Sequence, residues 1–371
     1  MKPKNIPLGK ILNIPIQLDY SWFLIFILLT WSLATSYFPA LYKSWTPLLY
    51  WVIGGATSLL LFVSVLLHEL GHSVLALRYK IPVRKITLFI FGGVAQITRE
   101  PPSAAAEFWI AIAGPVVSFM LAGIFYALQP LVQSLSPLLA LAKYLAYING
   151  ILGLFNLIPG FPLDGGRVFR AILWGLGHNL HRATRIAGTV GRIIAFGFIG
   201  FGIWQIFLGN FFGGLWIAFI GWFLESAATS QLQQQALQDL LAGHTVGQAM
   251  TQNYALISPD ITLQEMVNQG ILGVGRRAFL VQDSNQIIGV LAAPQLKKVA
   301  IEKWPETTAA QAMAPLNQIH LVQSQSDLWE SINEMEQEGV SQLPVLDDSQ
   351  VQGVLSREGV ISFMKKLQAA H

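Results

Sequence analysis

The chain has 371 residues, of which 53% are hydrophobic and only 12% are charged. This composition is too apolar and too sparsely charged for an ordinary soluble enzyme. There are no cysteines, which excludes disulfides, cysteine–zinc sites and thiol catalysis.

Charge divides the chain at about residue 230. Up to Ser230 there are 15 Lys and Arg residues against 6 Asp and Glu, and after Ser230 there are 8 against 14. The chain is therefore predicted to consist of two bodies, a basic apolar one followed by an acidic polar one.

Six apolar stretches of the first body are long enough to cross a membrane, which takes about 20 mostly apolar residues. They are roughly residues 20–38, 50–77, 104–128, 139–158, 187–208 and 211–229. Thirteen of the 15 basic residues lie on one side of these spans. Because basic loops stay in the cytosol, both termini are predicted to be cytosolic. The first stretch is long and lacks a convincing small-residue cleavage site, so we predict an uncleaved span rather than a signal peptide.

The end of the second span carries His68-Glu69-Leu70-Gly71-His72, which matches the pattern H-E-x-x-H. Residues four apart share one face of a helix, so both imidazoles can meet one metal ion, with Glu69 beside them as a base. An ionisable group at membrane depth costs about 2.5–3.5 kcal/mol, so three together favour a bound ion. The alternative is a histidine pair in a cytosolic turn that binds no metal.

The next segment, Lys85–Ile97, has the sequence KITLFIFGGVAQI. Its β-branched residues and its pair of glycines, Gly92 and Gly93, indicate β structure rather than a helix.

A carboxylate follows in the segment Asn156–Arg170, NLIPGFPLDGGRVFR, at the end of the fourth span. Zinc bound by two histidines needs a third protein ligand, and Asp164 is the candidate. Pro159 and Pro162 prevent a regular helix before it, and irregular backbone at membrane depth is tolerated only where it lines a cavity or is buried in protein. The alternative is a simple loop with a solvated aspartate.

These motifs resemble the site-2 protease family of intramembrane zinc metalloproteases, over nearly all of residues 1–229. The matching motifs, in the family's order and spacing, are HELGH (68–72), FGGVAQI (91–97), AGPVVS (113–118) and NLIPGFPLDGG (156–166). The resemblance implies one catalytic zinc ion bound by His68, His72 and Asp164, with Glu69 as the catalytic base.

The resemblance also implies how a peptide is bound. Asn156 matches a residue that donates a hydrogen bond to the oxyanion of the reaction. A transmembrane substrate must unwind first, and we expect it to pair by strand addition with the β segment at Gly92 and Gly93. The alternative is a self-contained hairpin without a substrate role. Ser118 stands where the family usually has Asn, a difference that we expect to affect helix packing rather than chemistry.

The acidic body contains two copies of one unit. The segments that start at Phe279 and at Leu343 align without gaps at an offset of 343 − 279 = 64, with six identical positions. Each copy shows a strand, a turn, a second strand and a helix. This resembles a tandem pair of cystathionine-β-synthase-type (CBS) domains, with a helical linker over 230–244, a first repeat over 245–304 and a second over 305–371.

Such pairs often bind adenine nucleotides, but the motif is incomplete here. The family's ribose-binding aspartate falls at Gln295 and at Gly359, and only the second copy keeps a phosphate-facing hydroxyl, at Ser356. A nucleotide is therefore a doubtful ligand, and a structural role or a homodimer formed through the CBS pair is at least as well supported.

Together these features predict a polytopic α-helical membrane protein of about six transmembrane helices with a small β element, followed by a C-terminal α/β CBS pair. The predicted function is zinc-dependent intramembrane proteolysis in the plasma membrane, with a cytosolic CBS pair as regulatory or dimerisation module. The predicted partners are a transmembrane protein substrate and the lipid bilayer, and no nucleic acid.

Two alternatives stay open. A catalytically inert relative would bind membrane proteins without cutting them, but it would have no need of Glu69. A CBS-gated metal or ion transporter would carry ionisable residues on several spans.

Overall fold

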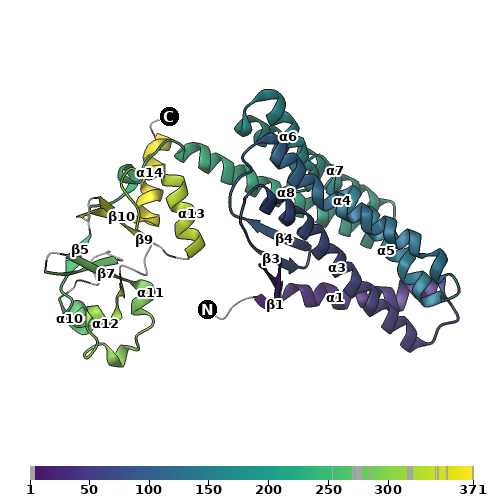
Figure 1. Ribbon diagram of the computed structural model, residues 1–371, viewed down its shortest axis with the longest axis horizontal. Helices are drawn as coiled ribbons and strands as arrows, with labels where there is room; N and C mark the ends of the chain where they lie inside the picture. The colour runs from purple at the N-terminus through teal and green to yellow at the C-terminus, as the bar shows by residue number, and fades with distance from the viewer. Residues whose placement is uncertain are drawn as a thin grey trace. The chain divides into compact units, whose positions relative to one another are not determined.

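The computed structural model describes residues 5–252, 254–269, 271, 278–284, 286–315, 321–338, 340, 342–347 and 350–369. The chain forms two compact units, Met1–Gln235 and Ala236–His371, which are drawn in Figure 1. Each unit has hydrophobic clusters of its own.

Among the described residues, six helices are long and apolar enough to cross a membrane, which confirms the predicted number of spans. The first, Ser21–Leu41, consists of α1 (Ser21–Ser32), a π-helical turn (Leu33–Tyr37) and α2 (Phe38–Leu41). The others are α3 (Pro47–Arg78), α4 (Ala104–Leu128, extended by a 3-10 turn to Val132), α5 (Ser136–Asn156), α7 (Leu180–Phe207) and α8 (Phe211–Leu241).

Two of these helices extend well beyond the predicted spans, α7 at its start and α8 at its end. α7 begins at Leu180 rather than near residue 187, because the Asn179 side chain accepts a hydrogen bond from the Arg182 N–H at 2.8 Å and caps the helix there. α8 continues through most of the predicted linker, as far as Leu241. Gln, Leu and Ala fill this stretch, and they favour a continued helix.

A four-stranded sheet belongs to the first unit, in the order β1-β2-β3-β4. Its strands are β1 (Asn5–Ile11), β2 (Ile14–Asp19), β3 (Val83–Phe89) and β4 (Gly92–Ile97). The predicted β segment forms the β3–β4 hairpin. The β1–β2 hairpin was not predicted from the sequence. Ile14, Ile16 and Leu18 are buried on alternate positions of β2, the period-two pattern of a half-buried strand. β4 is at the edge of this sheet, with β3 as its neighbour.

A short helix, α6 (Asp164–Gly177), lies between the fourth and fifth spans and packs against α4 and α7 (Figure 1). The irregular backbone predicted for this region therefore ends at Leu163. Glycines permit the close approach of α6 to the preceding loop: an added Cβ at Gly165 would lie 2.3 Å from the carbonyl of Leu157. At Gly166 an added Cβ would lie equally close to backbone, 2.3 Å from the carbonyl carbon of Gly160.

The second unit contains the internal repeat. Its strands are β5 (Ala255–Ile257), β6 (Ala278–Asp283), β7 (Gln286–Ala292), β8 (Ala314–Pro315), β9 (Gln342–Asp347) and β10 (Gln350–Ser356). Its helices are α9 (Val246–Ala249), α10 (Leu263–Asn268), α11 (Ala293–Leu296), a 3-10 turn (Ile301–Lys303), α12 (Ala309–Ala312), α13 (Leu328–Glu338) and α14 (Arg357–Ala369). The offset of 64 places β6 on β9 (278 + 64 = 342) and β7 on β10 (286 + 64 = 350).

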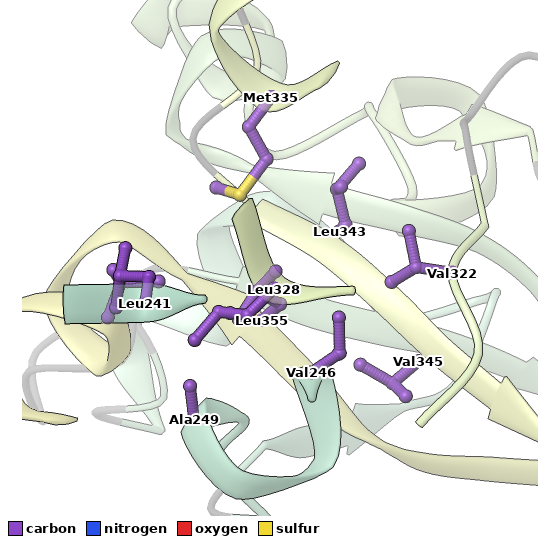
Figure 2. Close-up of a cluster of buried hydrophobic side chains, with 10 residues drawn as sticks. Leu241, Val246, Ala249, Val322, Leu328, Met335, Leu343, Val345 and Leu355 are labelled. Carbon is purple, nitrogen blue, oxygen red and sulfur yellow. The ribbon is translucent and has the colours of Figure 1, made fainter. Parts of the chain in front are cut away.

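The two repeats exchange their first helices. Val246 and Ala249 of α9 are buried in the hydrophobic cluster of the second repeat, which Figure 2 shows. Ala309 of α12 is buried in the cluster of the first repeat. Leu241, at the end of α8, is fully buried in the same cluster as α9. The repeats are therefore interlocked, and the end of α8 is part of their core.

Candidate metal centre

Three side chains from two helices converge on one point. His68 and His72 lie one turn apart on α3, and Asp164 is the first residue of α6. Asp164 Oδ2 lies 3.1 Å from His68 Nε2 and 3.2 Å from His72 Nε2, and the two Nε2 atoms are 3.3 Å apart. Both imidazoles are 4% exposed. The structure thus brings together the three predicted ligands as one group that could hold a metal ion.

Each histidine is oriented by a partner at its other ring nitrogen. His72 Nδ1 donates to the Ile110 carbonyl at 2.7 Å, so its Nε2 keeps a lone pair for a metal. His68 Nδ1 lies 2.8 Å from Ser118 Oγ. Ser118 of α4 therefore contacts a predicted ligand on α3, and whether this position affects only helix packing stays a prediction.

The arrangement fits a zinc ion. Ligand atoms about 2.0–2.1 Å from one tetrahedral ion lie about 3.3 Å apart, and the three donor atoms are 3.1–3.3 Å apart. Two imidazole nitrogens and a carboxylate oxygen are one of the donor sets found in catalytic zinc sites. Space for the imidazoles depends on Gly114 of α4, where an added Cβ would lie 2.1 Å from His72 Nε2 and 2.6 Å from His68 Nε2.

Gly114→Ala is therefore expected to abolish high-affinity zinc binding, because the new methyl group displaces both imidazoles. Zinc content of the purified protein and a chelator-competition titration measure this. The matched control is Gly123→Ala on the same helix, where an added Cβ meets nothing within 4 Å and zinc affinity should stay unchanged. Equal zinc affinity in the two variants would contradict the proposed site.

Glu69 lies against strand β4. Its Oε2 accepts a hydrogen bond from the Ala95 N–H at 3.1 Å. An added Cβ at Gly93 would lie 2.5 Å from Glu69 Cγ, so β4 approaches the glutamate this closely only with glycine at 93. Of the two glycines predicted to bind substrate, Gly93 thus lies against the predicted base. Gly92 has a φ of +134°, a backbone conformation that residues with a side chain rarely adopt.

Asn156 is the last residue of α5, and its amide donates to the Leu152 carbonyl at 3.0 Å. The amide is thus bonded within its own helix rather than to His68, His72 or Asp164. Its role towards an oxyanion stays a prediction.

The predicted nucleotide residues lie in the second unit. Ser356 Oγ accepts a hydrogen bond from the Gly359 N–H at 3.0 Å, so this hydroxyl caps α14. An added Cβ at Gly359 would lie 2.9 Å from the Ala249 carbonyl of the exchanged helix α9. Gln295, in α11, is the corresponding position of the first repeat. The backbone of α9 therefore lies in the space that the side chain of a ribose-binding aspartate at position 359 would enter.

Comparison with known proteins gives a consistent result. The sequence model of peptidase family M50 matches residues 56–138 and 130–198, and that of the CBS domain matches residues 309–366. Two relatives carry the name "putative zinc metalloprotease". One, sll0528 from Synechocystis sp., is 36% identical over 97% of this chain and 96% of its own length. The other, Rip3 from Mycobacterium tuberculosis, is 35% identical over 96% of this chain and 91% of its own length.

Among solved structures, the site-2 protease from Methanocaldococcus jannaschii is 30% identical and aligns over 62% of this chain and 95% of its own, with a TM-score of 0.42.

Proposed function

The chain belongs to peptidase family M50 and is a zinc metalloprotease, and from this we propose that it hydrolyses peptide bonds within or near the membrane spans of other proteins. Its six apolar helices and its relatives indicate an integral membrane protein. The observation that supports the proposal most is the location of the candidate ligands. His68 and His72 lie on α3, a helix long and apolar enough to span, and they are buried among the helices of the first unit.

In the proposed mechanism, zinc bound by His68, His72 and Asp164 supplies Lewis-acid chemistry. Glu69 takes a proton from the attacking water as the new C–O bond forms. It then returns that proton to the amine as the C–N bond breaks. The Ala95 N–H orients the Glu69 carboxylate for these proton transfers, and the absence of a side chain at Gly93 leaves room for the glutamate.

We propose that the unwound substrate pairs with the edge of β4. Two features support this role. β4 ends the sheet, so one of its edges is not paired within that sheet, and the same strand donates the Ala95 N–H to Glu69. A peptide added to this edge would have its backbone beside the base, and pairing would compensate for the helical hydrogen bonds that it loses.

The proposed activity is tested with purified protein and a panel of single-span substrates. Cleavage that stops when a chelator is added and returns with zinc is expected. Substrate binding without cleavage would instead favour the inert binder, and zinc or ion flux through proteoliposomes without cleavage would favour the transporter.

We propose that the CBS pair regulates cleavage through α8. This helix is continuous from Phe211 to Leu241, and Leu241 is buried in the CBS core. In the first unit, Phe223 of α8 stacks on Phe91 of the β3–β4 turn, with ring centroids 4.1 Å apart. A displacement of α8 would therefore reach the strand that we propose to bind substrate.

The full-length protein is expected to bind ATP or AMP weakly, with a dissociation constant above the micromolar range. Gln295 and Gly359 remove the carboxylate partners of the ribose, and each lost hydrogen bond to a charged group costs about 1.5–3 kcal/mol, roughly one to two decades of affinity. Calorimetry on the detergent-solubilised protein measures this. A micromolar or tighter constant would contradict the prediction and would make the pair an energy sensor.

We also propose that both termini are cytosolic, that the protein lies in the plasma membrane and that the CBS pair forms a homodimer. The one-sided distribution of basic residues supports the orientation. Because the chain has no cysteines, single cysteines introduced near either terminus can be tested for labelling from each side of the membrane. Light scattering measures the oligomeric state.

A further inference from the structure

A buried ion pair lies in the first unit, apart from the candidate ligands. Glu107, in the first turn of α4, is fully buried, and Arg170 of α6 is 7% exposed. Arg170 Nε donates to Glu107 Oε1 at 2.7 Å, and Arg170 Nη2 donates to the same oxygen. Burying two charges is costly unless they are paired, so the pair must be accounted for.

Arg170 also contacts two further elements. Its Nη1 lies 3.4 Å from Thr184 Oγ1 of α7, and its guanidinium lies over the ring of Phe161 at 5.4 Å. Phe161 belongs to the loop that precedes Asp164, and Thr184 Oγ1 donates to the Leu180 carbonyl of its own helix. One side chain thus joins α4, α7 and the loop to α6.

Two of the elements that Arg170 joins, α6 and α4, help to place the candidate ligands. α6 begins with Asp164, six residues before Arg170. α4 carries Glu107 three residues before Ile110, whose carbonyl accepts the hydrogen bond from His72. The separation of Asp164 from the histidines therefore depends on how α6 is held against α4. The guanidinium is planar and has several fixed donors, so it sets an orientation as well as a distance.

We propose that Glu107 and Arg170 are positioning residues for the metal centre: the ion pair fixes α6 against α4 so that Asp164 meets His68 and His72 at ligand spacing. This inference rests on the proposed metal site. It assigns a purpose to two buried charges that the proposed chemistry does not use.

The test compares three variants for zinc affinity, by chelator competition, and for thermal unfolding. Arg170→Met leaves Glu107 buried without the arginine that donates hydrogen bonds to it, and it should lower both stability and zinc affinity. Glu107→Gln/Arg170→Met removes both charges, so it should recover stability, because replacing a whole buried pair is often neutral. Its zinc affinity should stay about 10–100-fold below wild type, the loss typical when outer partners of a metal site are removed. Arg170→Lys, which keeps the charge without the planar fork, should fold and show an intermediate zinc affinity.

The cobalt-substituted proteins give a second readout, since the visible absorption of cobalt reports ligand geometry. The double variant and Arg170→Lys should show altered spectra. The matched control is Arg192→Met, because the Arg192–Glu225 pair, at 3.4 Å, joins α7 to α8 with the arginine side chain 44% exposed. This variant should keep wild-type zinc affinity and spectrum.

Wild-type zinc affinity and cobalt spectra in both the double variant and Arg170→Lys would overturn the inference and leave the pair a purely structural contact. A wild-type protein that binds no zinc would instead overturn the metal site itself, so the two failures are distinguishable.

Discussion

Glu69→Gln is expected to bind zinc with wild-type affinity and to lose peptide cleavage by about 10²–10⁴-fold, the usual contribution of a general base. The substitution leaves both imidazoles and Asp164 in place, and the amide can still occupy the space beside Gly93. What it loses is the ability to accept a proton. Parallel measurement of zinc content and of cleavage rate therefore separates metal binding from chemistry.

The matched control for Glu69→Gln is Glu225→Gln in the same unit. Glu225 pairs with Arg192 near the surface, so its neutralisation should leave cleavage intact. Full activity in Glu69→Gln would remove the proposed mechanism, whatever its zinc content.

Asp164→Ala is expected to lower zinc affinity by more than the roughly 10–100-fold typical of residues that only orient metal ligands. Two imidazoles alone make an incomplete site for zinc, so cleavage should fall together with zinc content. Asp164→Asn, which keeps the size of the side chain at the start of α6, should also bind zinc weakly, because the amide is a poorer ligand than the carboxylate.

Metal analysis and competition titration measure the effect of the Asp164 variants. Asp260→Asn, at an exposed position of the second unit, is the control and should leave zinc affinity unchanged. Wild-type zinc stoichiometry and affinity in Asp164→Ala would show that another group completes the site.

The main features of this fold could be predicted because the membrane spans and the repeat leave regular patterns. The length of the apolar stretches predicts all six spans, and the gapless offset of 64 relates β6 to β9 and β7 to β10. Helix ends were less predictable. The first turns of α7 contain arginines, so hydropathy does not assign them to a span. The hydrogen bond by which Asn179 caps this helix is visible only in the structure.

The candidate ligands could also be predicted, since H-E-x-x-H and a lone carboxylate are local signals. The residues that hold these ligands in place could not be predicted, because each acts through a contact between segments that are distant in the sequence. Gly114 is an ordinary glycine in the sequence, and its importance appears only when α4 packs against His68 and His72. Glu107 did carry a signal: it is an ionisable residue at the start of an apolar span, where a partner is to be expected.

The exchange of first helices between the repeats could not be predicted either. The sequence places residue 249 in the first copy, yet its carbonyl approaches Gly359 of the second. Sequence similarity between copies says which segments share a conformation, but it does not say which copy each segment packs against.

We propose that this zinc site cuts a peptide bond of a membrane-spanning segment. The direct test reconstitutes the protein with a single-span substrate in proteoliposomes and maps the cut by mass spectrometry of the products. We expect cuts within or next to the span, which disappear with a chelator and in Glu69→Gln. Cuts confined to soluble regions far from the span, or cuts that persist in Glu69→Gln, would contradict the proposed activity.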